Sequence, residues 1–309
     1  MKGVHSVRVI MLFFFVLGMP TAWCESQKPT IIQAVGIENE YADVIAQIGG
    51  QYVNVTAIIT DPNTDPHMFE LSPKIAAQIA AADLVIENGL GYDGWADKML
   101  SVAPKVDRKV INVQRLLGLN DSTPNPHLWY DPKTMPAVVA LLTDDLIALQ
   151  PDHAAYFRAN QAKFEASLTP WLAALAALKK DFPGSPVAVT EPVGDYMLDA
   201  AGLNIATPYS LELAIMNGTD PAPQDVTFEN KLFSAHKVKA LIYNQQVTDP
   251  LTEAFLNAAK KNHIAVVGVY ETMPVPGYNY QSWMLAETNA LRDAISENLS
   301  TQSLARGVH

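Results

Sequence analysis

Cysteine is nearly absent from this chain, because Cys24 is the only one among 309 residues. A single cysteine excludes a disulfide within the chain and excludes a metal site built from several thiolates. Basic residues are also scarce, with 21 lysines and arginines against 32 aspartates and glutamates and a net charge of −11. This acidic balance argues against nucleic acid as a partner and is compatible with a cationic ligand.

Sequence motifs that would identify a hydrolase are missing as well. The chain contains no His-Glu-x-x-His sequence and no nucleophile elbow, and it has neither low-complexity segments nor sequence repeats. Hydrophobic residues make up 49% of the chain and charged residues 17%. This composition is typical of a well-packed globular protein, and the length allows two domains of ordinary size.

The N-terminus has the pattern of a secretory signal peptide. Two basic residues precede an apolar run over residues 9–19, which is too short to span a membrane with ease. Cleavage after Cys24 places small residues, Ala22 and Cys24, at the positions that signal peptidase requires. We therefore predict that residues 1–24 are the signal peptide and that the protein is periplasmic. Lipid attachment to Cys24 is the alternative, although Trp23 is bulky for the position before a lipidated cysteine.

Strand-like and helix-like segments alternate along the remaining chain with short connections. The predicted strands are residues 30–36, 52–59, 83–88, 109–113, 187–190, 203–207, 238–243 and 264–270. The predicted helices between and after them are residues 38–48, 73–82, 133–150, 195–201, 227–236, 250–262 and 280–299, and residues 214–225 are expected to be a loop. This alternation predicts an α/β fold with two lobes, each a mostly parallel sheet flanked by helices.

The longest helical pattern lies between the two halves. It covers residues 151–180, and Pro170 is expected to kink or divide it. We therefore predict an N-terminal lobe over residues 25–150, a linking helix over 151–182 and a C-terminal lobe over 183–309. A helix is a stiff connector, so the two lobes are expected to move little relative to each other.

Four side chains stand at the ends of predicted strands or in the loops that follow strands. His67 and His127 lie in proline-flanked loops of the first half, and Glu191 and Glu271 end strands of the second half. The carboxyl ends of parallel strands meet at one edge of a sheet, where open α/β sheets bind their ligands. If these edges face each other, two imidazoles and two carboxylates converge. Such a set suits a divalent transition metal.

Each of these residues also has a structural interpretation. A histidine in a proline-flanked loop is more often structural than a ligand, and a glutamate at a strand end is often solvated. Glu191 would also interact favourably with the dipole of the helix that follows it. Spacing alone leaves metal binding and these structural roles open. Glu38 and Glu70 are candidates for supporting groups, and Asp93 and Trp95 are expected to shape the wall of the cleft.

Several short motifs resemble those of a known family. They are Glu38-Asn39-Glu40-Tyr41, Asp65-Pro66-His67, Asn88-Gly89-Leu90-Gly91-Tyr92-Asp93-Gly94-Trp95 and Asn125-Pro126-His127-Leu128-Trp129. With these motifs, most of residues 30–300 resembles the periplasmic zinc- and manganese-binding proteins of ABC transporters, the cluster A-I solute-binding proteins.

The resemblance implies two α/β lobes joined by a long, rigid helix, with a metal ion buried between them. The family's two histidine ligands match His67 and His127, and its third ligand, a histidine or glutamate, matches Glu191. The fourth ligand is usually an aspartate, and here Glu271 stands in its place with one more methylene. Residues 114–126 contain no histidine, so the chain lacks the histidine-rich and acid-rich loop of many zinc-specific members.

The expected function is therefore that of an extracytoplasmic solute-binding protein and not of an enzyme. We expect a monomer without a catalytic cofactor that captures Mn²⁺ or Zn²⁺, with Fe²⁺ as a third candidate, and delivers the ion to the membrane permease of an ABC transporter. Bidentate carboxylates would favour Mn²⁺ and monodentate carboxylates Zn²⁺, and two nitrogens with two carboxylates lean slightly to manganese. The alternatives are a metal-dependent surface adhesin and a secreted metallohydrolase with an open coordination position.

Overall fold

The computed structural model describes residues 1–3, 31–63, 66, 69, 71–274 and 276–304. The apolar run of the predicted signal peptide, His67 and Glu70 therefore lie outside the described residues. Ile31–His309 forms one compact unit, and the fold described below is the fold of that unit. Among the helices that the structure describes, none is long and apolar enough to cross a membrane.

The first half of the unit contains a four-stranded parallel sheet with the strand order β2-β1-β3-β4. Its strands are β1 (Ile32–Glu38), β2 (Val53–Ile59), β3 (Leu84–Glu87) and β4 (Lys109–Asn112). Successive side chains on a strand face opposite sides, so Ala34 and Ile86 pack in one core. Val35 and Val85 pack in a separate core on the opposite face. Both faces are covered, as the uninterrupted apolar runs of these strands require.

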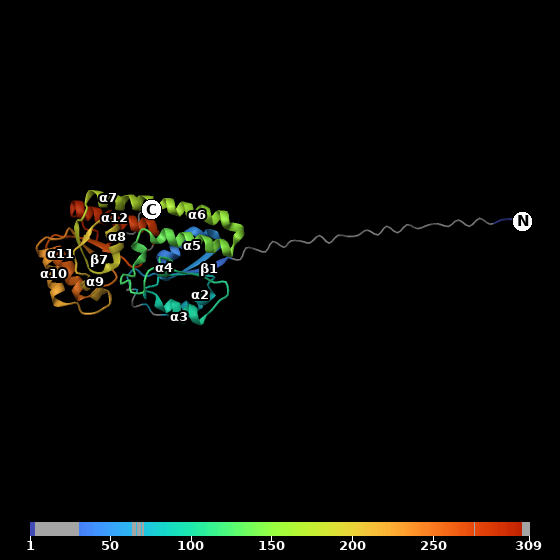
Figure 1. The fold of residues 1–309 in the computed structure, drawn as a ribbon, viewed down its shortest axis with the longest axis horizontal. Helices are drawn as coiled ribbons and strands as arrows, with labels where there is room; N and C mark the ends of the chain where they lie inside the picture. The colour runs from blue at the N-terminus through green and yellow to red at the C-terminus, as the bar shows by residue number, and fades with distance from the viewer. Residues whose placement is uncertain (4–30, 64–65, 67–68, 70, 275, 305–309) are drawn as a thin grey trace. The chain divides into compact units, whose positions relative to one another are not determined.

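Helices cover the two faces of this sheet. They are α1 (Asn39–Gly49), α2 (Pro73–Ala81), α3 (Gly94–Val102), α4 (Val113–Leu116) and α5 (Thr134–Leu149), with short 3-10 turns at Gly50–Tyr52 and Leu128–Tyr130. Figure 1 shows α2 and α3 on one side of β1 and α5 on the other. Helix α2 begins as the sequence predicts, because the Ser72 hydroxyl accepts a hydrogen bond from the Ile75 N–H at 3.3 Å and Pro73 is the first helical residue.

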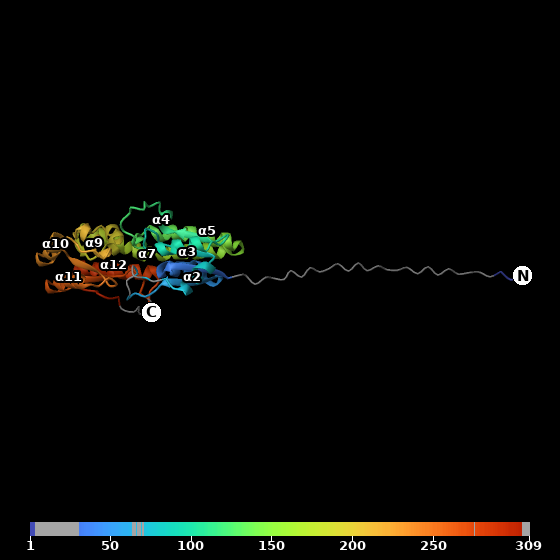
Figure 2. The same ribbon diagram turned by 90° about the horizontal axis from the view of Figure 1, so that it is seen from below.

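The helical segment between the two sheets is divided, and proline is the reason. It consists of a 3-10 turn (Pro151–His153), α6 (Ala154–Ser167) and α7 (Thr169–Asp181). Pro170 lies in the first turn of α7, where its missing N–H costs nothing, and the helix breaks at Leu168 just before it. Figure 2 shows α7 beside the last helix, α12 (Tyr280–Glu297), and these two helices pack against each other.

The second half contains another four-stranded parallel sheet, with the order β6-β5-β7-β8. Its strands are β5 (Pro186–Val189), β6 (Asn204–Ile205), β7 (Ala240–Asn244) and β8 (Ala265–Val269). Its other helices are α8 (Asp195–Ala200), α9 (Tyr209–Met216), α10 (Pro223–Ser234) and α11 (Pro250–Lys261), with a 3-10 turn at Pro192–Gly194. Helix α9 occupies residues partly expected to be loop, and β6 is shorter than predicted.

Strand β8 lies at an edge of the second sheet, and the C-terminal segment covers that edge. The Thr301 N–H donates to the Val266 carbonyl at 2.8 Å, and the Gly268 N–H donates to the Thr301 carbonyl at 2.9 Å. A Cβ at Gly268 would overlap the backbone carbonyl of Gln302. The approach is therefore too close for any side chain, and the segment satisfies backbone groups that an edge strand leaves unpaired.

The two halves share one core. Trp129, Trp171 and Trp283 are fully buried members of a cluster that contains residues of both sheets. At this junction the Tyr130 hydroxyl lies 2.8 Å from the Tyr270 carbonyl and 2.8 Å from Glu287 Oε2. Tyr130, in the segment that follows His127, is thus hydrogen-bonded to the residue that follows β8, although the two segments lie far apart in the sequence.

Candidate metal centre

His127 is fully buried, and its neighbours determine which ring nitrogen carries the proton. Asn125 Oδ1 accepts a hydrogen bond from the His127 N–H at 3.0 Å and lies 2.8 Å from His127 Nδ1. The Asn125 amide donates its Nδ2–H to the Pro192 carbonyl at 2.6 Å, which confirms that Oδ1 faces the histidine. Because Oδ1 is an acceptor, Nδ1 holds the proton of the neutral imidazole and Nε2 holds a lone pair.

The loop of His127 is held in place by the motif residues of the first half. Asn88 Nδ2 donates to the Pro126 carbonyl at 2.8 Å, and the Tyr41 hydroxyl donates to Asn88 Oδ1 at 2.8 Å. Asp93 accepts from the N–H groups of Asn88 and Gly89 at 2.6 and 2.9 Å. Burial raises the pKa of Asp93 to about 6. Asp93 therefore holds the turn that contains Asn88, the residue whose amide contacts the histidine loop.

Glu271 follows β8 and faces His127. Its Oε2 lies 3.3 Å from His127 Nε2 and accepts a hydrogen bond from the Tyr92 hydroxyl at 3.0 Å. Its backbone N–H donates to Gln246 Oε1 at 2.7 Å. The side chains of His127 and Glu271 are both fully buried, so the contact between the imidazole and the carboxylate lies in a region of low dielectric constant.

Asn39 fixes the chain just beyond Glu271. Its Nδ2 donates to the Met273 carbonyl at 2.8 Å, and its Oδ1 accepts from the Met273 N–H at 3.0 Å. One amide therefore pairs with both backbone groups of a residue from the other half of the chain. The Glu38-Asn39-Glu40-Tyr41 motif thus contributes to the centre by holding its surroundings.

Glu191 follows β5 and is connected to Glu271 through Asn244, the last residue of β7. Asn244 Nδ2 donates to Glu191 Oε1 at 3.2 Å and to Glu271 Oε1 at 2.8 Å. The strand order places β7 between β5 and β8, so the ends of three adjacent strands supply these three side chains. Glu191 is 3% exposed, which means that its carboxylate is also removed from bulk water.

The structure thus brings together three of the four predicted ligands. His127 and Glu271 are in direct contact, Glu191 reaches Glu271 through Asn244, and His67 lies outside the described residues. Within the part of the chain that is described, no group of three or more His, Cys, Asp or Glu side chains is arranged to hold a metal ion.

Two further glutamates of the Glu38-Asn39-Glu40-Tyr41 motif are buried in this region. Burial raises the pKa of Glu38 well above its usual value, and the charges of Asp93 and Glu40 raise it further. Burial also raises the pKa of Glu40, with a contribution from the charge of Glu271. Their carboxyl oxygens make no hydrogen bonds in the described residues. Burial and neighbouring negative charges therefore both favour the protonated forms of these two carboxyl groups.

Several supporting residues were not assigned a role from the sequence. Asn39, Tyr92 and Asn125 lie within the motifs that carry the family resemblance, but spacing along the chain does not reveal their partners. Asn244 and Gln246 lie outside those motifs. The one signal that could have found Asn244 is its place at the end of a predicted strand, in common with Glu191 and Glu271.

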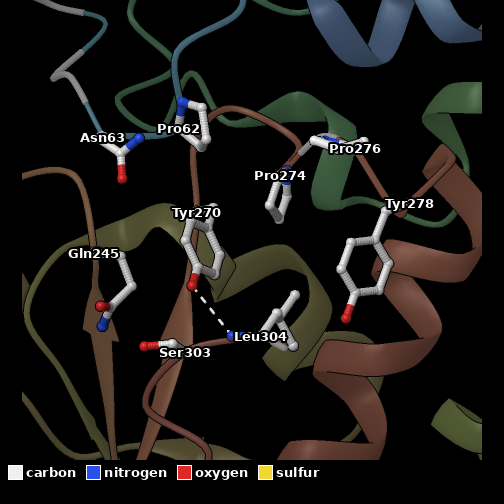
Figure 3. A pocket seen from close by; sticks show the side chains of 9 residues that line it. All are labelled: Pro62, Asn63, Gln245, Tyr270, Pro274, Pro276, Tyr278, Ser303 and Leu304. Atoms are coloured by element: carbon white, nitrogen blue, oxygen red, sulfur yellow. Dashed lines mark hydrogen bonds between the residues drawn. The ribbon is translucent and has the colours of Figure 1, made fainter. Parts of the chain in front are cut away.

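A pocket of about 310 Å³ opens beside Tyr270, the residue before Glu271. It is lined by Pro62, Asn63, Gln245, Tyr270, Pro274, Pro276, Tyr278, Ser303 and Leu304. Figure 3 shows the Tyr270 hydroxyl accepting a hydrogen bond from the Leu304 N–H, at 3.2 Å. The described residues that line the pocket do not include His127, Glu191 or Glu271. The pocket is therefore separate from the candidate centre, and Tyr270 connects the two because it directly precedes Glu271.

Comparison with known proteins adds an independent observation. A family model described as ZnuA, the periplasmic component A of a zinc-uptake complex, matches residues 38–294. The chain is 23% identical over 280 residues to a putative metal-binding protein of Chlamydia trachomatis, an alignment that covers 87% of this chain and 92% of that protein.

Two solved structures have a similar fold. The periplasmic zinc-binding protein TroA from Treponema pallidum aligns with a TM-score of 0.72 at 17% identity, over 87% of this chain and 99% of that chain. The solute-binding protein FpvC from Pseudomonas aeruginosa, in complex with Mn²⁺, aligns with a TM-score of 0.70 at 19% identity, over 86% of this chain and 99% of that chain. At these identities the similarity establishes a shared fold.

Proposed function

The chain belongs to the ZnuA family, the periplasmic metal-binding components of ABC importers, and from this premise we propose that it captures Zn²⁺ or Mn²⁺ between its two halves. The proposed ligands are His67, His127, Glu191 and Glu271. The ion is cargo that the protein passes on to the membrane permease, and no reaction is performed on it. The two-lobed α/β fold predicted from the sequence is confirmed and is the fold of this family.

The observation that supports this proposal most strongly is the pairing of His127 with Glu271. An imidazole nitrogen with a lone pair and a carboxylate oxygen both attract a cation, and they lie 3.3 Å apart in a buried region. The two side chains come from different halves of the chain. A cation that binds both would therefore also hold the halves together, and its release would require them to separate.

Binding of the ion competes with protons. Both histidines must be neutral and both glutamates ionised to act as ligands. An unperturbed histidine has a pKa of about 6.5. We therefore expect metal affinity to fall as pH decreases from 7.5 to 5.5, which would favour release in acidic surroundings.

The test is a competition titration of chelator-stripped protein against a fluorescent metal indicator at pH 7.5, 6.5 and 5.5. The proposal expects one Zn²⁺ or Mn²⁺ per chain and a dissociation constant that increases at each step toward pH 5.5. Binding that does not change with pH would contradict ligation by histidine. The absence of binding by any transition metal would contradict the proposed cargo.

A further inference from the structure

The side-chain amide of Asn244 has a fixed orientation. The residue is 1% exposed and lies at the end of β7, in the middle of the second sheet. Its Oδ1 accepts a hydrogen bond from the Gln246 N–H at 3.0 Å, and its own N–H donates to the Thr190 hydroxyl at 3.0 Å. Because a backbone N–H can only donate, the atom that faces Gln246 must be oxygen. The NH₂ group must then face the glutamates.

This NH₂ group has two hydrogens, and the structure gives each of them a carboxylate. One hydrogen bond reaches Glu271 Oε1 at 2.8 Å and the other reaches Glu191 Oε1 at 3.2 Å. The other oxygen of Glu271, Oε2, is the one that lies 3.3 Å from His127 Nε2. A cation bound beside His127 therefore meets Oε2 of Glu271, while Oε1 is directed toward the amide.

A carboxylate with one oxygen hydrogen-bonded to a fixed donor is biased toward binding a metal through the other oxygen alone. Neighbouring hydrogen bonds of this kind orient metal ligands and tune the metal. Two monodentate glutamates and two histidines give four donor atoms, the number that tetrahedral Zn²⁺ requires. Two bidentate glutamates would raise the number of donor atoms to six and would suit Mn²⁺, which favours oxygen-rich sites of higher coordination.

We propose that Asn244 is a specificity-determining residue that makes the centre selective for zinc over manganese by keeping Glu191 and Glu271 monodentate. This inference rests on the ligand set of the proposed function. It differs from the expectation drawn from ligand type alone, which leans to manganese. Asn244 itself does not touch the ion in this scheme, and it acts through the two carboxylates.

The test compares dissociation constants for Zn²⁺ and Mn²⁺ in the wild type and in two variants of Asn244. Asn244→Ala removes the amide. Asn244→Asp keeps the shape and the oxygen that accepts from Gln246 but cannot donate to the glutamates, so it serves if the alanine variant does not fold. Gln245→Ala is the matched control, because Gln245 is the next residue in the chain. Its Nε2 donates no hydrogen bond to Glu191 or Glu271 in the described part of the structure.

The wild type and Gln245→Ala are expected to bind zinc more tightly than manganese. In Asn244→Ala, zinc affinity should fall about 10- to 100-fold, the usual effect of removing a partner of a metal ligand, while manganese affinity falls less. The ratio of the two constants should therefore move toward manganese by about tenfold, and Asn244→Asp should shift it in the same direction. An unchanged ratio in both variants, with metal still bound, would overturn the inference.

X-ray absorption spectroscopy of the zinc-loaded wild type provides a second readout that needs no variant. The proposal expects four nitrogen or oxygen neighbours at about 2.0–2.2 Å and a higher coordination number in Asn244→Ala. A wild-type site with five or six neighbours would contradict it. These results are distinct from failure of the proposed function, in which the wild type binds neither metal.

Discussion

Replacing Glu229 with glutamine is expected to remove about 2 kcal/mol of the pH dependence of folding stability between pH 6 and pH 8. Glu229 lies on α10 and is fully buried. Its Oε1 accepts a hydrogen bond from the Thr207 hydroxyl at 3.2 Å, and its Oε2 has no hydrogen-bond partner in the described part of the chain. Burial raises the pKa of Glu229 to about 8, so the folded protein holds a proton there at neutral pH.

The size of the effect follows from the two pKa values of Glu229. In the unfolded chain a glutamate has a pKa of about 4.3, and below that pH the stabilising contribution of the folded-state proton is fully present. As the pH rises toward the folded pKa of about 8, the unfolded chain loses the proton and the folded protein keeps it. Stability then falls by about 1.4 kcal/mol per pH unit. Between pH 6 and pH 8 the loss from this group alone is about 2 kcal/mol.

The assay is urea unfolding of metal-free protein at pH 6 and pH 8. The wild type should lose about 2 kcal/mol more than Glu229→Gln over this interval. Glu165→Gln removes an exposed carboxylate on α6 and should keep the wild-type dependence. A large dependence should remain in Glu229→Gln, because burial also raises the pKa of Glu212 to about 10, that of Glu287 to about 8, and those of Glu87 and Asp195 to about 7. Equal losses in the wild type and Glu229→Gln would refute this assignment.

Two further substitutions test the site and the covering of β8. Asn125→Ala removes the acceptor that orients His127, so the dissociation constant for metal should rise about 10- to 100-fold; an unchanged constant in a competition titration would argue against ligation through Nε2. Gly268→Ala places a methyl group against the C-terminal segment and should destabilise the protein by about 1–3 kcal/mol in urea unfolding. Gly94→Ala, whose Cβ would meet no atom within 4 Å, is its control, and equal stability of the two variants would show that the segment does not constrain β8.

The elements of the fold could be predicted from the sequence because their signals are local. Apolar runs such as residues 84–86 mark buried strands, and Pro170 marks the division of the linking segment. Helix α9 was not predicted from the sequence, because its pattern is not amphipathic. Glu212 lies among apolar residues of α9 and is itself buried, and a buried carboxyl cannot be told from an exposed one by sequence.

The candidate centre could be predicted only in outline. Strand ends indicated Glu191 and Glu271, and a proline-flanked loop after a strand indicated His127, because residues at the same edge of parallel strands gather in space. The hydrogen bonds that orient them depend on pairing between distant segments, such as Asn39 with a residue 234 positions away. No periodicity in the chain records such a pairing, and the bridging role of Asn244 likewise became visible only in the structure.

The most direct test of the central claim is a thermal melt of chelator-stripped protein with added Zn²⁺, Mn²⁺ or Mg²⁺. A metal at one hundred times its dissociation constant should stabilise the folded wild type by about 2.7 kcal/mol. The account predicts a clear increase in melting temperature with Zn²⁺ or Mn²⁺, little change with Mg²⁺, and loss of most of the increase in both His127→Ala and Glu271→Ala. A wild type that does not respond to any transition metal, or variants that respond as fully as the wild type, would contradict a metal ion held jointly by the two halves of this chain.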